Sequence, residues 1–222
     1  MAIKRIIFLG PPGTGKGTQA ARMSERFGLE AMSSGDTLRQ EIKAGSDVGQ
    51  KAAEYVEAGT LVPDEIITGV MLAGINKLPA GIGFILDGFP RTVPQAESLA
   101  DGLARAGMGL DGVIDFQMDD QRIIERIVTR RVCSSCGATY NIRFFPPRVE
   151  GVCDKCGGQV AQRVDDREDV IKTRLETYRS QTAPLIEFYS QQGLLRTVDA
   201  SQEAEAVEVQ VVKIIEAVGQ EP

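Results

Sequence analysis

The chain contains no histidine and no tryptophan, and aromatic residues make up only 5% of its 222 residues. Without histidine, a histidine general base and histidine metal ligands are both excluded. Any chemistry must therefore depend on lysine, arginine, carboxylates or a bound metal ion. That restriction favours phosphoryl transfer, in which a protein mainly positions its substrates and neutralises charge.

Long apolar runs and an excess of positive charge are also missing. No apolar stretch reaches the roughly 18 residues of a membrane-spanning helix, and the N-terminus carries no signal-peptide pattern. The 25 lysines and arginines are outnumbered by 31 aspartates and glutamates, a net charge of −6. This balance argues against nucleic acid or an anionic membrane as the main partner. We expect a soluble, cytoplasmic monomer that forms one medium-sized domain with small insertions.

Cysteines are few, but their spacing is regular. Cys133 and Cys136 are followed by Cys153 and Cys156, which gives Cys-x2-Cys-x16-Cys-x2-Cys. In an intracellular protein this spacing predicts a zinc site. Four sulfur ligands complete the tetrahedral coordination of Zn²⁺ and leave no position for water, so the metal would be structural. Two alternatives stay open: reduced cysteines without a metal, and iron, which four thiolates also bind.

The strongest motif is the segment 10–18, Gly-Pro-Pro-Gly-Thr-Gly-Lys-Gly-Thr. An apolar run precedes it and a helical pattern follows it, which is the context of a phosphate-binding loop. The glycines let backbone N–H groups turn towards an anion, and the start of the following helix adds its positive dipole end. Lys16 would reach the outer phosphates, and the Thr18 hydroxyl would lie near Mg²⁺. The pattern predicts a nucleotide phosphate site, although Gly17 separates the lysine from the hydroxyl residue that usually follows it directly.

Short apolar strands alternate with helical patterns through most of the chain. This alternation predicts an α/β fold with a doubly wound parallel sheet that helices cover on both faces. Five strands are predicted, over 5–9, 29–33, 83–87, 112–117 and 194–198. Residues 36–75 hold two or three helices, too many for one ordinary crossover, so we expect a helical excursion from the sheet there.

The third predicted strand ends in Asp87 and continues as Gly-Phe-Pro-Arg. A carboxylate at the carboxyl end of a parallel strand would face the phosphate loop and hold Mg²⁺ through water beside Lys16. The stiff turn at 88–90 would direct Arg91 into the same crevice. An Asp-Gly turn alone is a weak signal, but its combination with the Lys16 loop is specific.

Arginines recur in the segment that leads to the cysteines. Arg122, Arg126 and Arg130 are spaced by four residues, which predicts a basic face along one helix. Such a face is either solvated or a clamp for polyphosphate. Since the run lies between the sheet and the cysteine module in an acidic protein, we favour the clamp.

The segment 130–166 holds the cysteines and has little helical periodicity. We interpret it as a small zinc-held domain that is inserted through two neighbouring strands, with a long helix beginning near Asp169. Asp165 and Asp166, at its end, either form salt bridges at the hinge or begin a helix, or they act in catalysis. The arginines expected at the hinge are Arg130, Arg131, Arg163 and Arg167.

These motifs resemble those of the adenylate kinase family, and the likeness extends over nearly the whole chain. The loop has the Gly-x-Pro-Gly-x-Gly-Lys-Gly-Thr form of nucleoside monophosphate kinases, in which Gly17 is expected. The Asp-Gly-Phe-Pro-Arg segment is highly specific, and the cysteine module resembles the zinc-bearing lid of the family's long form. The other matches in family order and spacing are Ser33-Ser34-Gly35-Asp36 with Arg39, Thr92 with Gln95, Arg126 with Arg130, and Arg163 with Arg174.

The resemblance implies a P-loop kinase fold and reversible, Mg²⁺-dependent phosphoryl transfer from ATP to AMP, which gives two ADP. It divides the chain into a core of 1–32, 63–128 and 167–222, an AMP-binding helical insertion of 33–62 and a zinc-binding lid of 129–166. Closure of the insertion and the lid would keep water from the transferring group.

The resemblance also assigns roles to residues. The expected catalytic residues are Lys16, Arg91, Arg130, Arg163 and Arg174, of which Arg163 and Arg174 would reach the phosphates when the lid closes. The expected ATP contacts are Gly13, Thr14, Gly15, Lys16, Gly17, Thr18, Arg126 and Arg130, with Thr139 and Tyr140 covering the adenine and Gln202 touching it through its backbone. The expected AMP contacts are Ser34, Arg39, Thr60, Leu61, Val62, Gly88, Phe89, Pro90, Arg91, Gln95, Arg163 and Arg174. Mg²⁺ would lie by Thr18 and Asp87, and Zn²⁺ on Cys133, Cys136, Cys153 and Cys156.

Two alternatives remain. Within the enzyme class, the nearest alternative is a kinase for UMP or CMP, or one that uses GTP as donor. Ser34 stands where the family frequently has threonine, which weakens the expectation of strict AMP preference, and Gln95 favours AMP. A zinc-ribbon nucleic-acid-binding protein with a nucleotide switch is the second, and the net charge of −6 disfavours it.

Overall fold

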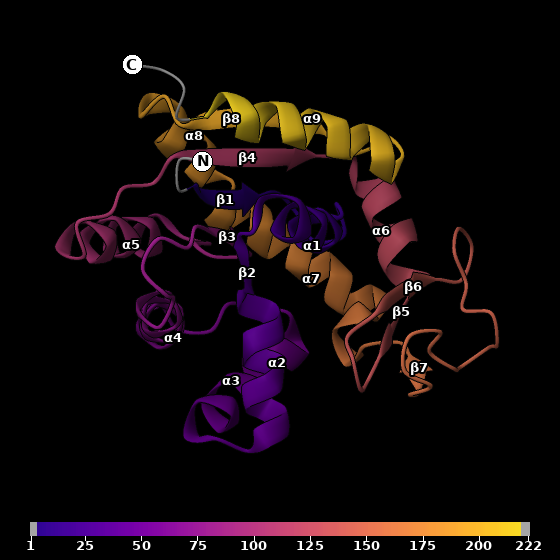
Figure 1. The fold of residues 1–222 in the computed structure, drawn as a ribbon. Coiled ribbons are helices and arrows are strands. Elements are labelled where there is room, and N and C mark those ends of the chain that lie inside the picture. The colour runs from indigo at the N-terminus through magenta and orange to yellow at the C-terminus, as the bar shows by residue number, and fades with distance from the viewer. Residues whose placement is uncertain (1–3, 219–222) are drawn as a thin grey trace.

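The computed structural model describes residues 4–218, and its centre is a five-stranded sheet (Figure 1). The strand order is β2-β3-β1-β4-β8, and every neighbouring pair is parallel. This arrangement confirms the predicted doubly wound parallel sheet, and each predicted strand lies within one residue of the observed bounds. The strands are β1 (Arg5–Leu9), β2 (Glu30–Ser33), β3 (Phe84–Asp87), β4 (Gly112–Gln117) and β8 (Leu195–Asp199).

Helices cover both faces of the sheet, so successive residues of a central strand are buried on opposite sides. Ile6 packs with α1 (Lys16–Phe27) and α9 (Ala204–Ala217), whereas Ile7 packs with α4, α5 and α8; both are 0% exposed. Burial on two faces explains the nearly continuous apolar strands of the sequence. The bounds of the second layer are α4 (Asp64–Asn76), α5 (Val93–Arg105) and α8 (Pro184–Gln191). Among residues 4–218, no helix has both the length and the apolar character needed to cross a membrane.

Two helices extend away from the sheet after β2. They are α2 (Ser34–Ala44) and α3 (Asp47–Ala58), seen below the sheet in Figure 1. The hydroxyls of Ser33 and Ser46 cap their N-termini, and left-handed glycines end them. The two helices are tightly packed, because a Cβ on Gly49 would lie 2.1 Å from the carbonyl oxygen of Glu41. With α4, they make three helices in the region where two or three are expected.

The cysteine segment forms a separate three-stranded antiparallel sheet, with the order β6-β5-β7. Its strands are β5 (Arg130–Cys133), β6 (Thr139–Asn141) and β7 (Val160–Ala161). The chain enters through α6 (Asp120–Val128) and leaves through the 3-10 turn η1 (Val164–Asp166) and α7 (Glu168–Thr177). Because β5 pairs with β7, entry and exit lie side by side. A π-helical turn, η2 (Tyr178–Thr182), joins α7 to α8.

One expectation about this region is wrong. Arg122, Arg126 and Arg130 do not share a helical face, because α6 ends at Val128 and Arg130 begins β5. The side chains of Arg122 and Arg126 donate to backbone carbonyls after β8. Arg130 instead bonds with Asp166. The change from helix to strand therefore divides these three arginines between two places, the segment after β8 for Arg122 and Arg126 and Asp166 for Arg130.

Candidate functional site

The loop between β1 and α1 has a conformation that favours glycine, and at two of its glycines a side chain would also clash with neighbouring elements. Gly10 and Gly13 have φ angles of 133° and 84°, which side chains with a Cβ rarely adopt. A Cβ on Gly10 would lie 2.6 Å from the carbonyl oxygen of Phe116, and one on Gly13 would lie 2.6 Å from Cγ1 of Ile127. The loop is therefore packed against β4 and α6, and its backbone is fixed before α1 begins.

Lys16, the first residue of α1, directs its ammonium group back over this loop. Its Nζ donates to the carbonyl oxygens of Gly10 at 2.8 Å and Pro11 at 2.7 Å. Burial lowers the pKa of Lys16 to about 8, and the positive charges of Arg91 and Arg174 act in the same direction. The lysine from the loop thus lies in one electrostatic environment with two arginines from other elements.

Asp87, at the end of β3, lies next to the same loop. Its Oδ2 is 3.4 Å from the position that a Cβ on Gly17 would take. Burial raises the pKa of the Asp87 carboxyl, although Lys16 and Arg91 oppose the shift. Thr18 is exposed one residue further along. A carboxylate and a hydroxyl beside a phosphate loop are the hard oxygen donors that suit Mg²⁺.

A cavity opens between α2, α3, α4 and the turn after β3. Its polar lining includes Arg39, Arg91 and Arg174, and Gln95 lies at its wall, 2% exposed. The carbonyl oxygen of Gly88 accepts both the Ser34 hydroxyl at 2.5 Å and Nε of Arg91 at 2.7 Å. Of the residues that the resemblance assigns to AMP, those lining this one cavity are Ser34, Arg39, Thr60, Leu61, Val62, Gly88, Arg91, Gln95 and Arg174.

Three members of the expected AMP set do not line that cavity. Phe89 is 0% exposed and belongs to the apolar core, and Pro90 is also buried. Arg163 lies outside the lining, where its guanidinium pairs with Asp36 at 3.5 Å. Phe89 and Pro90 therefore shape the turn that presents Gly88 and Arg91, and their side chains do not face the cavity.

The cavity also contains residues that the motifs do not indicate. Leu38, Val56 and Ile67 form an apolar part of its wall, and Asp165 also lines it. These three apolar residues belong to ordinary helical stripes, so only their three-dimensional arrangement reveals them. Asp165 is recognised in the sequence only as a residue at the hinge.

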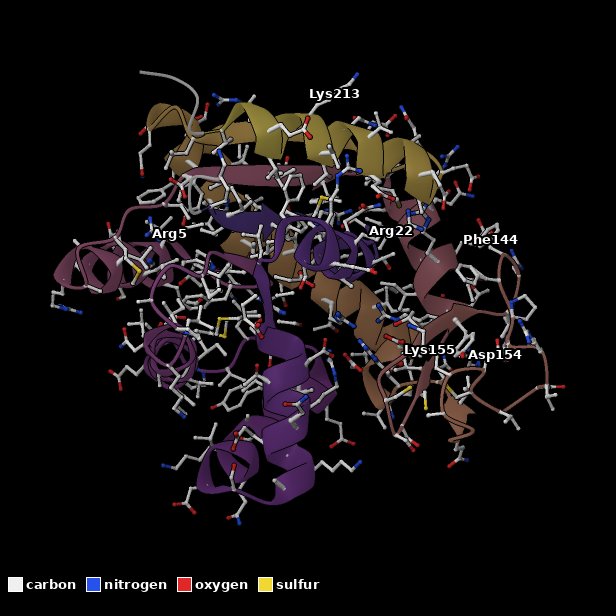
Figure 2. The ribbon with its side chains drawn as sticks, viewed as in Figure 1. Arg5, Arg22, Phe144, Asp154, Lys155 and Lys213 are labelled. Atoms are coloured by element: carbon white, nitrogen blue, oxygen red, sulfur yellow. The ribbon has the colours of Figure 1, made fainter. Side chains whose placement is uncertain are left out.

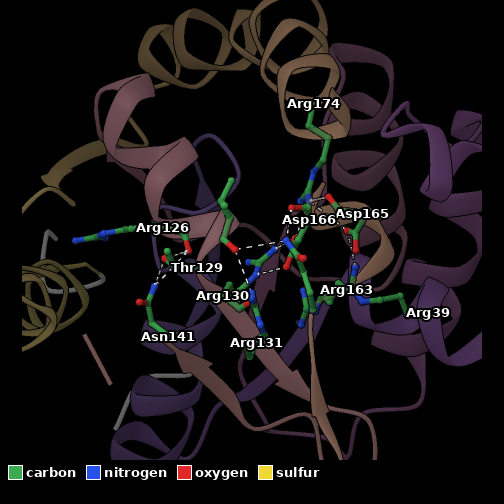
Figure 3. Close-up of polar contacts among 12 residues, drawn as sticks. Arg39, Arg126, Thr129, Arg130, Arg131, Asn141, Arg163, Asp165, Asp166 and Arg174 are labelled. Carbon is green, nitrogen blue, oxygen red and sulfur yellow. Dashed lines mark hydrogen bonds and ion pairs between the residues drawn. The ribbon is translucent and has the colours of Figure 1, made fainter. Parts of the chain in front are cut away.

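A cluster of arginines and aspartates joins the cavity to the cysteine module (Figure 3). Nε of Arg130 donates to Oδ2 of Asp166 at 2.8 Å, and its second nitrogen bonds Oδ1. Oδ2 of Asp165 pairs with Arg174 at 3.2 Å and with Arg39 at 3.4 Å. The salt-bridge interpretation of the two aspartates is therefore confirmed.

Because this cluster is buried, the pKa of each charged group in it depends strongly on its charged neighbours. Asp165 and Asp166 are 4% and 0% exposed. Burial alone would raise the pKa of Asp165, but the surrounding guanidinium groups hold it below its usual value. Burial lowers the pKa of Arg163 and Arg174, yet arginine remains charged at neutral pH. The cluster therefore concentrates guanidinium groups, whose N–H groups bind the oxygens of carboxylates and phosphates.

Arg126, on α6, contacts the segment that follows β8. Its guanidinium donates to the carbonyl oxygens of Ala200 at 3.1 Å and Gln202 at 3.4 Å. Arg126 and the Gln202 backbone, which the resemblance assigns to ATP, are thus neighbours. Thr139 is exposed on β6, but the side chain of Tyr140 points into the cysteine module and is 7% exposed. The buried ring of Tyr140 therefore leaves its backbone as the part that a base could meet.

The four cysteines converge within the module. Asp154 and Lys155, which Figure 2 labels, lie between the last two of them in the chain. The four cysteine sulfur atoms lie within 4.8 Å of one another, and no disulfide joins these cysteines. The Cys133–Cys156 and Cys136–Cys153 sulfur pairs are each 3.5 Å apart. Zinc–sulfur bonds of about 2.3 Å in a tetrahedron need sulfurs roughly 3.8 Å apart. The donor set and its spacing therefore fit a tetrahedral metal ion.

Tyr140 adds a hydrogen bond to this cluster. Its hydroxyl accepts the N–H of Asp154 at 2.8 Å and lies 3.3 Å from Sγ of Cys153. The hydrogen bond between the Tyr140 hydroxyl and the Cys153 sulfur, together with backbone N–H groups, lowers the pKa of the Cys153 thiol to about 6. The sequence does not indicate this role, because nothing in the local pattern aligns Tyr140 with a cysteine 13 residues away.

A parallel α/β sheet with a glycine-rich loop at its carboxyl edge, a loop lysine and converging arginines defines a P-loop nucleotide-binding protein. Comparison with known proteins shows to which family of P-loop proteins the chain belongs. The family model described as Adenylate kinase matches residues 8–194.

Proteins named adenylate kinase are similar to the chain over nearly its whole length. That of Carboxydothermus hydrogenoformans is 47% identical over 203 residues, which cover 91% of this chain and 95% of the relative. Those of Caldicellulosiruptor saccharolyticus and Archaeoglobus fulgidus are 46% and 42% identical, and cover 95% and 96% of this chain and 98% of each relative. The chain belongs to the adenylate kinase family and is a phosphotransferase.

Proposed function

We propose that the chain transfers the γ-phosphoryl group of Mg²⁺-bound ATP reversibly to AMP, giving two ADP. The observation that carries this proposal is electrostatic. Arg91 and Arg174 line the cavity between α2, α3 and α4, and both lower the pKa of Lys16 beside the phosphate loop. A donor site at the loop and an acceptor site in the cavity would therefore face each other.

The donor is assigned to the loop and to the surface between α6 and β8. The backbone N–H groups of residues 13–18 would hold the phosphates at the N-terminus of α1, with Lys16 and Arg130 on the outer ones. Arg126 and the Gln202 backbone, which are in hydrogen-bond contact, would hold the base together with Thr139.

The acceptor is assigned to the cavity. Arg39, Arg91 and Arg174 would hold the phosphate of AMP, and Gln95 would bind its base beside the apolar wall. Arg39 and Arg174 each pair with Asp165, so they lie where one anion can bridge both. Arg163, which pairs with Asp36, would join them when the lid closes.

The reaction needs no general base, which agrees with the absence of histidine. An oxygen of the AMP phosphate is already anionic and attacks the γ-phosphorus. The bond from that phosphorus to the β,γ-bridging oxygen breaks, and the β-phosphate leaves with the electron pair as ADP. Lys16 and the arginines would stabilise the charge on the transferring oxygens. Mg²⁺, held near Thr18 and Asp87, would supply further charge neutralisation and orient the donor phosphates.

Two parts of the chain would close over the nucleotides: the insertion of 33–62 and the lid of 129–166. Both would move relative to the core, which consists of 1–32, 63–128 and 167–222. Arg39 comes from the insertion, Arg130 and Arg163 from the lid, and all three belong to the arginine–aspartate cluster. Closure would exclude water, so that ATP is not hydrolysed.

We assign Zn²⁺ to the four cysteines in a structural role, because four thiolates complete its coordination and leave no site for substrate. The lid has a small core of its own, in which Cys133, Tyr140, Cys153 and Val160 are buried. A core of that size needs a metal to keep its shape. We also propose a monomer in the cytoplasm, where thiols stay reduced for metal binding.

A coupled assay of ADP formation tests the proposal. Donors ATP and GTP are each combined with AMP, UMP and CMP, and we expect the ATP–AMP pair to give the highest kcat/KM. Lys16→Met should lower kcat by at least about 100-fold while the circular dichroism spectrum is retained. Preference for UMP or CMP, or near-normal turnover of Lys16→Met, would overturn the assignment.

A further inference from the structure

The side-chain amide of Gln95 is held at both of its ends by other residues. Its Oε1 accepts the backbone N–H of Arg91 at 2.7 Å, and its Nε2 donates to Oδ1 of Asp64 at 2.6 Å. Asp64 opens α4, Arg91 follows β3, and Gln95 lies in the first turn of α5. Three separate elements therefore meet at one buried amide.

Both contacts specify the same orientation of the amide. A backbone N–H only donates and an ionised carboxylate only accepts, so the atom near Arg91 must be the oxygen and the atom near Asp64 must be the nitrogen. Rotation of the amide by 180° would place the NH₂ group against the N–H of Arg91 and the oxygen against the carboxylate. Two repulsive contacts would replace two hydrogen bonds.

Asp64 is itself held in place. Its Oδ2 accepts the hydroxyl of Thr92 at 2.8 Å, and that hydroxyl oxygen accepts the N–H of Gln95 as the cap of α5. Asp64 also lies in the first turn of α4, where the helix dipole favours a negative charge. The carboxylate is thus fixed by a side chain and by its helix, and through Thr92 it is linked to the backbone of Gln95.

The amide retains hydrogen-bonding capacity for a ligand. A carboxamide oxygen accepts two hydrogen bonds and its nitrogen donates two, and Arg91 and Asp64 use one of each. Gln95 lines the cavity near Val62 and Ile67, which offer an apolar surface to a flat base. A base in the cavity would therefore meet an acceptor and a donor in an order that the protein has fixed.

We propose that Asp64 is a positioning residue for base specificity. By fixing the amide of Gln95, it selects a base that presents an amino donor beside a ring-nitrogen acceptor, as adenine does. Hypoxanthine, guanine and uracil present a carbonyl acceptor beside a ring N–H and would meet a mismatched amide. Cytosine shares the pattern of adenine, so the amide separates amino bases from carbonyl bases. This inference rests on the proposed AMP site.

The test compares AMP with IMP, which differ at this edge, in the wild-type protein and in Asp64→Asn. Asparagine is isosteric, but it can donate as well as accept, so it no longer excludes the rotated amide and only the N–H of Arg91 still specifies the orientation of Gln95. We expect the ratio of kcat/KM for AMP to that for IMP to fall at least about tenfold. The change should appear mainly in KM for AMP, with kcat retained within about threefold, because the phosphate-binding residues are untouched.

Glu65→Gln is the matched control, since Glu65 is exposed on the same helical turn, and its AMP-to-IMP ratio should equal that of the wild type. Thermal melting checks the fold of each variant. Asp64→Ser also removes the carboxylate and is compatible with a first helical turn, so its AMP-to-IMP ratio of kcat/KM should fall as well. An unchanged ratio in both Asp64 variants, with AMP still a good substrate of the wild type, overturns only the inference. If the wild-type protein does not phosphorylate AMP, the proposed function and the inference both fail.

Discussion

Arg130 and Asp166 face each other in a two-pronged ion pair, in which Nε of Arg130 lies 2.8 Å from Oδ2 of Asp166. The carboxylate is 0% exposed, and the Arg130 side chain is 18% exposed. Arg130 begins β5 and Asp166 ends η1, so the pair joins the entrance of the cysteine module to its exit. A carboxylate of the protein thus holds the guanidinium group that we assign to the phosphates of the substrate.

Asp166→Asn should destabilise the fold. The substitution leaves the largely buried guanidinium of Arg130 without its counter-charge, which costs about 1–3 kcal/mol of the free energy of unfolding. Denaturant titration measures this quantity. Glu125→Gln is the control, because Glu125 and Arg143 form an exposed pair, 44% and 61% exposed, and its loss should cost less than about 0.5 kcal/mol. Equal effects of the two substitutions would contradict the structural role of the buried pair.

Lys16 should make stability depend on pH. Its pKa is about 8 in the folded protein and about 10.4 in an unfolded chain. Between these values the unfolded state binds more protons, so the stability of the wild type rises with pH relative to Lys16→Met. At pH 7 we expect Lys16→Met to be the more stable protein, and this advantage should shrink between pH 8 and 10.5.

Thermal or denaturant unfolding of both proteins across this range provides the measurement for Lys16. Lys172→Met is the matched control for loss of a lysine at the surface, because Lys172 is 62% exposed in a pair with Glu168. A constant difference between the wild type and Lys16→Met would show that the Lys16 ammonium is not buried.

Metal removal should affect the lid before it affects the chemistry. Elemental analysis of the purified protein should give one zinc per chain, held by the four cysteines. Dialysis against a chelator, followed by its removal and restoration of Mg²⁺, should lower the melting temperature by several degrees and leave measurable transfer at low temperature. An unchanged melting temperature after verified zinc loss would contradict a structural metal.

Tyr140→Phe should weaken metal retention without unfolding the protein. It removes the hydroxyl that lies 3.3 Å from Sγ of Cys153 and keeps the ring in the lid core. Loss of such an outer contact typically lowers metal affinity 10- to 100-fold. Competition with a chromophoric chelator measures the affinity, and Tyr189→Phe, at a residue 3% exposed in the main core, is the control. Equal zinc affinity of the two variants would rule out a role for the Tyr140 hydroxyl at the metal.

Features encoded by neighbouring residues could be predicted from the sequence. The five strands, the loop lysine and the cysteine pairs each depend on short spacing, and the sheet, the loop and the sulfur cluster have the expected form. The basic run failed as a prediction because the spacing of Arg126 and Arg130 continues past Val128, where α6 ends. Spacing alone does not show where a helix gives way to a strand.

Contacts between distant segments could not be predicted. Asp64 and Gln95 are 31 residues apart, and their hydrogen bond exists because α4 and α5 pack on the same face of the sheet. The inward direction of Tyr140 likewise depends on the pairing of β5 with β6. Each of these residues has an ordinary local pattern, and its role follows only from the folded arrangement.

We expect one cleft of the protein to hold a donor and an acceptor nucleotide end to end, so that a phosphoryl group passes between them. The most direct measurement is the stoichiometry of the reaction. The purified protein is incubated with ATP, AMP and Mg²⁺, and the nucleotides are then separated and quantified. We predict that each AMP consumed removes one ATP and yields two ADP, with no free phosphate. Release of phosphate from ATP with AMP unchanged would contradict the account.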